Sequence, residues 1–286
     1  MISNSILTVC IITYNHEDFI ANALESVFKQ ITDFDFQIVI ADDFSTDNTR
    51  DILEKYKSIY SDKITLIFQK ENVGAAKNWI DLLKYPKSKY IAYLEGDDFW
   101  TDPYKLQKQV NYLEINRDCN LCFHNSSVFI DNKIEFNYTN TNKKKIIFED
   151  LISPHFIATS SIIFKNNIEF PNWVFKIKSG DKVLLFLSSI MGKIGYINEV
   201  MSVYRIHRNG MSQTDDHKGI LKVYNMFELY YHLNEYTNFQ YHDKFISGLY
   251  SEINEHIISK LTKNEPSFKE IITLVLRKIK RKIYIK

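Results

Sequence analysis

The chain has 286 residues, of which 45% are hydrophobic and 25% charged, and its formal net charge at pH 7 is +1. This length and composition suit a globular protein with one large α/β domain and a smaller appendage. The near-zero charge gives no support to nucleic-acid binding, which normally requires a basic surface. We therefore expect no nucleic-acid partner.

Cysteine usage and the absence of targeting signals indicate the compartment. Cys10, Cys119 and Cys122 are too few to build a disulfide framework, which predicts a reducing environment. The apolar run at residues 6–12 is too short for a secretory signal, and no small-residue cleavage site follows it. No stretch approaches the roughly 18–20 apolar residues of a membrane-spanning helix. The prediction is a cytoplasmic protein, soluble or at most peripheral on the inner face of the cell membrane.

The first hundred residues alternate between strand-like and helix-like patterns. Nearly continuous apolar runs predict buried strands at 6–12, 36–41, 64–68 and 90–94. One-sided apolar spacing predicts intervening helices with apolar faces at 19–28 and 52–60 and a third helix around 78–84, and Asn15 is expected to cap the first. Short polar segments connect these elements. The alternation predicts an α/β fold with a Rossmann-like, mostly parallel sheet flanked by helices.

From Cys119 onward the pattern changes. Strands are predicted at 121–130, 157–164 and 194–206, with a turn at 131–133 and a polar loop at 139–145. Residues 181–191 predict a helix that Gly192 ends. Helical patterning resumes near residue 215. We therefore expect a main domain at 1–212, with halves at 1–115 and 116–212, and a small helical extension at 213–286.

The last part of this extension is basic and amphipathic. Ile271, Val275, Ile279 and Ile283 recur every four residues, while lysines and arginines crowd the segment from residue 277. That pattern is typical of a helix lying on anionic lipid. It is equally typical of a helix that docks its apolar stripe on its own domain. Both interpretations of 271–286 stay open.

Polar clusters follow the predicted strands of the first half. Because the carboxyl ends of parallel strands share one edge, where ligands bind, these clusters should lie together. They are Thr13-Tyr14-Asn15, Asp42-Asp43, Asn72-Val73-Gly74 and Glu95-Gly96-Asp97-Asp98.

The last cluster predicts a metal site. Asp97 and Asp98 are adjacent carboxylates, with Glu95 just before them, and such groups repel one another unless a cation neutralises them. A hard divalent cation held by one or two carboxylates and diphosphate oxygens is the usual solution. The alternative is a solvated turn or a helix cap before Pro103.

The Asp42–Asp47 segment predicts recognition of a nucleotide base. A carboxylate such as Asp43 can accept the N–H of a pyrimidine, and Tyr14 can stack on its face. The alternative is helix capping by Ser45, Thr46 or Asp47. Both functions fit one segment, with Asp43 binding and the following residues capping.

Seven segments, in this order and spacing, resemble the signature of family 2 glycosyltransferases over roughly residues 5–212. They are Thr13-Tyr14-Asn15, Asp42-Asp43-Phe44-Ser45-Thr46-Asp47, Asn72-Val73-Gly74, Glu95-Gly96-Asp97-Asp98-Phe99-Trp100, Asp102-Pro103-Tyr104-Lys105-Leu106, Gly180-Asp181 and Val203-Tyr204-Arg205-Ile206-His207. The resemblance implies a GT-A fold, Mn²⁺ or Mg²⁺, and a nucleoside-diphosphate sugar donor.

The resemblance also assigns roles. It places the metal-site aspartates at Asp97 and Asp98, the base-recognition aspartate at Asp43 and the acceptor-activating aspartate at Asp181. The chain departs from the common pattern at Phe44, where glycine is usual, which puts the uracil preference in doubt. It departs again at Glu95, where aspartate is commoner, and there we expect metal binding to survive.

Two further features support these roles from the residues themselves. Asp181 precedes an apolar helix, where the helix dipole stabilises a carboxylate; plain N-capping is the alternative. His207 lies between Arg205 and Arg208, which fits a cationic loop over a diphosphate, and a histidine can complete a metal shell. The alternative is an ordinary basic surface cluster. The predicted donor-nucleotide residues are thus Thr13, Tyr14, Asn15, Asp43, Asn72, Gly74, Asp97, Arg205, His207 and Arg208, and the predicted metal ligands are Asp97, Asp98 and His207.

The predicted function is inverting transfer of a sugar, from a UDP-sugar in the first instance, to a hydroxyl of a surface-polysaccharide or lipid-linked glycan. A sugar-1-phosphate nucleotidyltransferase or a dehydrogenase would need a glycine-rich loop where Tyr14-Asn15-His16-Glu17 stands. A non-catalytic nucleotide- or glycan-binding module would be expected to lose the carboxylates. Cys119, Cys122 and His124 lack the fourth ligand of a structural zinc site, so packing is the better interpretation.

Overall fold

The computed structural model describes residues 5–130, 133–152, 156–208, 210 and 219–261. The chain forms two compact units, one made of Met1–Phe175 and Ser179–Gly210, the other of Lys176–Lys178 and Met211–Lys286. None of the described helices is long and apolar enough to cross a membrane. The predicted basic segment at 271–286 lies outside the described residues.

The first unit is built on one mixed sheet. Its ten described strands are β1 (Leu7–Thr13), β2 (Phe36–Asp42), β3 (Ile64–Phe68), β4 (Tyr90–Glu95), β5 (Phe99–Trp100), β6 (Cys119–Ile130), β7 (Lys133–Asn137), β8 (Lys145–Ile146), β9 (Ile163–Lys165) and β10 (Lys193–Ile206). The order across the sheet is β3-β2-β1-β4-β9-β6-β10-β5, with β7 paired to β6 and β8 to β10.

Six of these strands run in one direction. β1, β2, β3 and β4 pair in parallel, and β6 pairs in parallel with β10. β9 is antiparallel to both β4 and β6, so β6 and β10 share the direction of β4. The carboxyl ends of all six therefore lie at one edge of the sheet, and the predicted α/β, mostly parallel architecture is confirmed.

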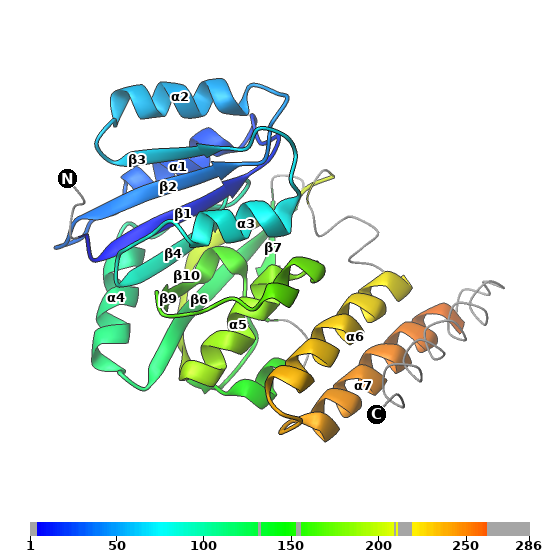
Figure 1. Ribbon diagram of the computed structural model, residues 1–286. Helices are drawn as coiled ribbons and strands as arrows, with labels where there is room; N and C mark the ends of the chain where they lie inside the picture. The colour runs from blue at the N-terminus through cyan, green and yellow to red at the C-terminus, as the bar shows by residue number, and fades with distance from the viewer. Residues whose placement is uncertain (1–4, 131–132, 153–155, 209, 211–218, 262–286) are drawn as a thin grey trace. The chain divides into compact units, whose positions relative to one another are not determined.

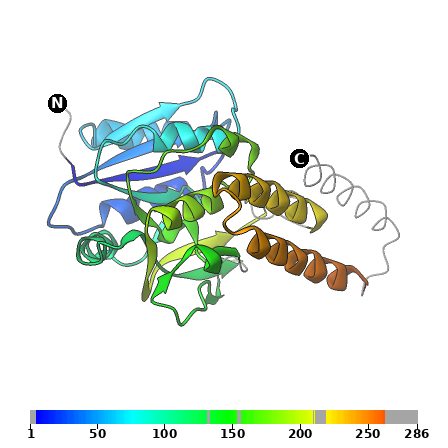
Figure 2. The ribbon, with the colours of Figure 1, turned by 60° about the horizontal axis from the view of Figure 1, so that its bottom comes forward.

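Helices cover both faces of the sheet. They are α1 (Ile20–Phe28), α2 (Thr49–Ile59), α3 (Ala75–Leu83), α4 (Lys105–Ile115) and α5 (Gly180–Met191). Figure 1 shows α3 and α5 on one face and α1 on the other, and Figure 2 shows the helices again on both sides of the strands. Gln30, which follows α1, connects this helix to the start of α4. Its side chain accepts the Leu106 N–H (3.0 Å) and donates to the Asp102 carbonyl (2.8 Å).

The core follows the hydrophobic pattern. Alternate residues of β1 and β2 face the helix α1, and Leu7, Val9, Ile11, Leu24 and Ile38 have no exposed surface. Burial of such side chains contributes about 1.5–3 kcal/mol each. The nearly continuous apolar runs of the sequence are thus explained by strands that are covered on both faces.

Two local predictions were wrong. The first helix begins at Ile20 rather than after Asn15, and no side chain caps it. Asn15 adopts a left-handed conformation (φ 53°), and its side-chain oxygen accepts the Thr46 N–H at 2.8 Å. The strand predicted at 157–164 is shorter, because a 3₁₀ turn at Thr159–Ser161 precedes β9.

Besides Lys176–Lys178, the second unit contains a pair of described helices, α6 (Gly219–Tyr236) and α7 (His242–Leu261). The two helices contact each other through an aromatic pair and an ion pair. The ring centroids of Tyr230 and Phe245 are 5.0 Å apart, and Lys222 Nζ lies 2.9 Å from Glu252 Oε2. The predicted helical character of the chain beyond residue 215 is confirmed for these residues.

Candidate functional site

The polar clusters that follow the strands lie together in the folded chain. Thr13 at the end of β1 is in register with Asp42 at the end of β2, and Ile12 is in register with Glu95 at the end of β4. β10 ends at the same edge and leads directly into His207. Residues almost 200 positions apart in the sequence therefore meet around the acidic loop.

Asp97 and Asp98, although adjacent, face different surroundings. The Asp97 side chain is 16% exposed, and its Oδ2 lies 3.0 Å from His207 Nε2. Asp98 is only 1% exposed, and its Oδ1 accepts the backbone N–H of Arg205 at 2.9 Å. Asp97 is thus the member of the pair that faces the open side of the loop.

The carboxylates perturb one another. Burial raises the pKa of Glu95 well above its ordinary value, and the charges of Asp97, Asp98 and Asp181 raise it further. Burial and the charge of Asp97 likewise raise the pKa of Asp98. Burial also acts to raise the pKa of Asp97, but the hydrogen bond from His207 and the neighbouring His16 outweigh it and lower that pKa. The site concentrates negative charge in a poorly solvated place.

The donor set at this loop fits a divalent cation shared with a substrate. Asp98 Oδ2 is buried and has no hydrogen-bond partner among the described residues. No three His, Cys, Asp or Glu side chains of the described chain form a complete metal-binding group. Mg²⁺ and similar hard cations are commonly bound through one or two carboxylates, with phosphate oxygens and water supplying the rest. The residues therefore fit a cation that arrives with a diphosphate.

Arg205 holds the acidic loop in place. Its guanidinium donates to the Asp97 carbonyl at 2.5 Å and to Asn22 Oδ1 at 2.7 Å. The same group lies over the rings of Phe99, 4.4 Å from the centroid, and Phe19, 5.4 Å from the centroid. These contacts clamp the end of β10 against α1. The predicted binding of a diphosphate by Arg205 stays a prediction, as it does for the exposed Arg208.

The predicted base-recognition residue lies between two loops. Asp43 Oδ1 accepts the Val73 N–H at 2.7 Å, and the Asp43 N–H donates to the Thr13 carbonyl at 3.1 Å. Burial raises the pKa of Asp43, although the N–H groups of Val73 and Gly74 act in the opposite direction. Asn72, next to Val73, is exposed. The three predicted loops are therefore joined at Asp43.

The loop after β1 is fixed to the loop after β2 through Asn15. Its N–H donates to Ser45 Oγ at 2.8 Å, and its side chain accepts the Thr46 N–H. Tyr14 beside it is 43% exposed, which leaves its ring available to a ligand. Of the residues that could cap the next helix, Asp47 accepts the Thr49 N–H at 3.0 Å at the start of α2. The Ser45 hydroxyl instead donates to the Asp42 carboxylate.

Phe44, the departure from the common glycine, keeps a left-handed backbone (φ 65°). That conformation is unfavourable for a bulky side chain. The Arg50 guanidinium lies 5.1 Å from the centroid of the Phe44 ring and 4.8 Å from that of Phe68. It also forms an ion pair with buried Asp42, with Nε 2.5 Å from Oδ1. Phe44 therefore covers an ion pair that supports the loop predicted to bind the base.

Asp181 comes from the opposite half of the sequence. It is the second residue of α5, whose first residue, Gly180, packs on Trp79; a Cβ at Gly180 would lie 3.1 Å from that ring. Asp181 is half-buried, and its charge acts on Glu95 and on the buried Tyr93. The fold thus brings the predicted acceptor-side carboxylate beside the predicted donor-side loop.

Sequence reasoning gave no role to His16 or Asn22. His16 Nε2 lies 3.8 Å from Asp97 Oδ2, and Asn22 Oδ1 accepts a hydrogen bond from the Arg205 guanidinium. Burial lowers the pKa of His16 despite the charge of Asp97. The only available signal for His16 was its position directly after Tyr14-Asn15. Cys119 and Cys122 are buried, free cysteines on β6, and no metal group forms among the described residues around them.

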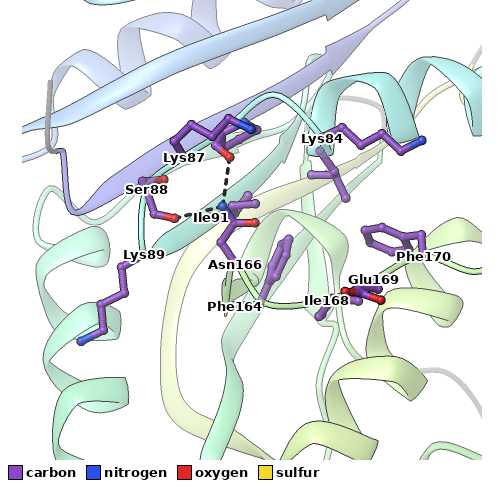
Figure 3. Close-up of a pocket in the computed structure, with 12 residues that line it drawn as sticks. Lys84, Lys87, Ser88, Lys89, Ile91, Phe164, Asn166, Ile168, Glu169 and Phe170 are labelled. Carbon is purple, nitrogen blue, oxygen red and sulfur yellow. Dashed lines mark hydrogen bonds between the residues drawn. The ribbon is translucent and has the colours of Figure 1, made fainter. Parts of the chain in front are cut away.

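A separate pocket of about 710 Å³ opens at the other end of β4. Its rim carries Lys84, Lys87 and Lys89, and Asn166 supports the rim by donating to the carbonyls of Pro86 (3.1 Å) and Ser88 (3.0 Å) (Figure 3). The pocket lies before Tyr90, whereas the acidic loop follows Glu95 at the carboxyl end of the same strand. It is therefore separate from the acidic site.

A family comparison agrees with this geometry. The model of "Glycosyl transferase family 2" matches residues 8–169, which contain β1 to β4 and the acidic loop. The chain belongs to this family.

Relatives of this family 2 glycosyltransferase occur in several bacteria. An uncharacterized protein of Mycobacterium tuberculosis is 32% identical over 207 residues, covering 72% of this chain and 60% of its own length. The chain thus spans about three fifths of that relative's length. The UDP-Glc:alpha-D-GlcNAc-diphosphoundecaprenol beta-1,3-glucosyltransferase WfaP of Escherichia coli is 29% identical over 211 residues, covering 72% of this chain and 80% of its own.

Solved structures support the fold. The mannosyltransferase PcManGT from Pyrobaculum calidifontis, in complex with GDP-Man and Mn²⁺, superimposes with a TM-score of 0.56 at 15% identity. The match covers 99% of this chain and 82% of the other. The predicted GT-A fold of this family 2 glycosyltransferase is therefore confirmed.

Proposed function

We propose that the protein is an inverting, metal-dependent glycosyltransferase that moves a sugar from a nucleoside-diphosphate sugar, in the first instance a UDP-sugar, to an acceptor hydroxyl. The observation that carries this proposal is the meeting of Asp97 and His207 at the carboxyl edge of the sheet, with Asp181 beside the same loop. A binding module would not need a further carboxylate on the acceptor side.

The donor side is assigned to the loops after β1, β2, β3 and β4. We assign base recognition to Asp43 and Tyr14, with Thr13, Asn15, Asn72 and Gly74 shaping the pocket. We assign the cation to Asp97 and His207, which are partly exposed, and to Asp98, whose buried Oδ2 has no hydrogen-bond partner among the described residues. Bound Mn²⁺ or Mg²⁺ would offset the charge that grows on the departing diphosphate.

The acceptor side is assigned to Asp181. Its carboxylate takes the proton of the acceptor hydroxyl while that oxygen forms a bond to the anomeric carbon. The bond from that carbon to the diphosphate oxygen breaks, and the nucleoside diphosphate leaves with the electron pair. Attack opposite the leaving group inverts the anomeric configuration. Residues 1–115 would thus supply the donor half and 116–212 the acceptor half of the catalytic domain.

The acceptor class is proposed from the relatives. The Escherichia coli relative is named for transfer from UDP-Glc to a diphosphoundecaprenol-linked GlcNAc. We propose a lipid-linked or surface-polysaccharide glycan as acceptor and a place at the inner face of the cell membrane. Lipid contact through 271–286 belongs to this proposal, and that segment lies outside the described residues.

Hydrolysis of a panel of nucleotide sugars, measured with Mn²⁺ and with excess chelator, tests the proposal. We expect sugar release from one or a few UDP-sugars, only with the metal. Lys87→Ala, in the separate pocket, is the matched control and should behave as the wild type. Nucleotide binding without any sugar release across the panel would favour a binding module, and release in chelator would overturn the metal role.

A further inference from the structure

His16 is a donor-site side chain that the proposed function leaves without a role. Its main chain is fixed on both sides: the N–H donates to Thr49 Oγ1 at 2.8 Å, and the carbonyl accepts the N–H groups of Phe19 and Ile20 at 2.9 Å each. The side chain is 17% exposed. The position of the ring is therefore set by the loop between β1 and α1.

The His16 ring faces the carboxylate that we assign to the cation. Its Nε2 lies 3.8 Å from Asp97 Oδ2, the same oxygen that His207 Nε2 meets at 3.0 Å. The two imidazole rings are nearly perpendicular (79°), with centroids 6.4 Å apart. A separation of 3.8 Å is longer than a hydrogen bond. Contacts of this kind commonly shorten when a site takes its ligand.

The other edge of the ring lies over Gly96. His16 Nδ1 and Thr13 Oγ1 are both buried, and neither has a hydrogen-bond partner among the described residues. A Cβ at Gly96 would lie 2.9 Å from each of them. The glycine is therefore required for both side chains to occupy this place.

We propose that His16 is a positioning residue of the donor site: its Nε2 edge faces the same Asp97 carboxylate oxygen that His207 contacts and helps to hold that carboxylate in place. This inference rests on the proposed function, in which Asp97 is a ligand of the cation. A carboxylate held by two imidazoles keeps one orientation, and such supporting contacts commonly change metal affinity 10–100-fold.

Binding of Mn²⁺ to the full-length protein with saturating UDP, followed by electron paramagnetic resonance and corrected for the Mn²⁺ that UDP binds alone, tests the proposal. We expect His16→Ala to weaken Mn²⁺ binding at least about tenfold. His16→Gln, whose amide N–H reaches the place of Nε2–H, should recover most of that loss. In an Asp97→Asn background, His16→Ala should add less than about a twofold change, because the two residues act as one unit. His232→Ala controls for the loss of an unrelated histidine.

The outcomes separate this inference from the function on which it rests. Wild-type Mn²⁺ affinity in Asp97→Asn would overturn the assigned cation site itself. A clear loss in Asp97→Asn with no loss in His16→Ala would overturn only the role of His16. An equal loss from His16→Ala in both backgrounds would also overturn it, because His16 would then act without Asp97. Unchanged thermal unfolding of each variant confirms that the fold is intact.

Discussion

His207 Nε2 lies 3.0 Å from Asp97 Oδ2, although 110 positions separate the two residues. The contact joins the end of β10 to the loop after β4, and the ring of Phe19 closes one side of it, 4.6 Å from the His207 ring. A carboxylate and an imidazole that share one partly exposed space are suitable ligands for a divalent cation. The pair therefore connects two distant segments of the first unit.

His207→Ala should weaken metal-dependent binding of a nucleoside diphosphate, because it removes one of three proposed protein ligands. We expect a loss of about 10–100-fold in affinity with Mn²⁺ present. Calorimetric titration of UDP with and without Mn²⁺ measures it. Lys87→Ala is the control, and an unchanged Mn²⁺ effect in His207→Ala would show that His207 is not a ligand.

Arg205→Ala should destabilise the fold. The guanidinium makes two charge-assisted hydrogen bonds, to Asp97 and Asn22, and it lies over two rings. Loss of these contacts is expected to cost about 2–3 kcal/mol in the free energy of unfolding. Urea unfolding compares it with Arg208→Ala, an exposed neighbour expected to change stability by less than about 0.5 kcal/mol. Equal stability of the two variants would contradict the clamp.

Phe44 offers a test of backbone strain. Phe44→Gly removes the ring over Arg50 but also relieves a left-handed conformation (φ 65°) that costs a side-chain-bearing residue about 1–2 kcal/mol. Phe44→Val also loses the ring and keeps the strain, with an added β-branch. We expect the glycine variant to be about 1–2 kcal/mol more stable than the valine variant in chemical unfolding. A more stable valine variant would contradict the interpretation.

Lys105 makes stability depend on pH. Its side chain is fully buried over the Trp100 ring, Nζ lies 4.0 Å from the centroid, and burial lowers the pKa of Lys105 to about 7. Between that value and the ordinary lysine pKa near 10.4, the unfolded chain binds a proton that the folded chain does not. Stability should therefore rise with pH across this window, by at most about 1.4 kcal/mol per pH unit.

Lys105→Met removes this titration while keeping an unbranched side chain. The difference in unfolding free energy, wild type minus Lys105→Met, should increase from pH 7 toward pH 10 and stay flat below pH 7. Tyrosines and cysteines that titrate in the same range are present in both proteins and cancel in the difference. Parallel stability curves would show that Lys105 titrates normally.

The sequence predicted the architecture well because periodicity is local information. The apolar runs that became β1, β2 and β4 and the polar residues at their ends follow from strands covered on both faces. The bounds of short antiparallel strands were not predictable in this way. The strand predicted at 157–164 overlaps β9, which has only three residues and pairs with β4 and β6.

Within the site, the sequence identified residue types but not their orientation. Asp97 and Asp98 are equivalent in the sequence, yet one faces His207 and the other the Arg205 backbone, because neighbouring side chains project in different directions. Asn15 was expected to cap a helix, but its side chain instead accepts a hydrogen bond from the Thr46 N–H in the loop after β2. The place of His16 depends on the missing side chain of Gly96, which no local pattern reveals.

Asp181→Asn tests the central claim most directly, because it separates sugar transfer from donor binding. The paired measurement is UDP affinity by calorimetry with Mn²⁺ and sugar transfer to an acceptor hydroxyl on the same preparation, using the nucleotide sugar found in the panel. We predict near-normal UDP affinity and unfolding temperature, with transfer reduced about 10²–10⁴-fold. Undiminished transfer, or lost UDP binding in a folded Asp181→Asn protein, would contradict the account.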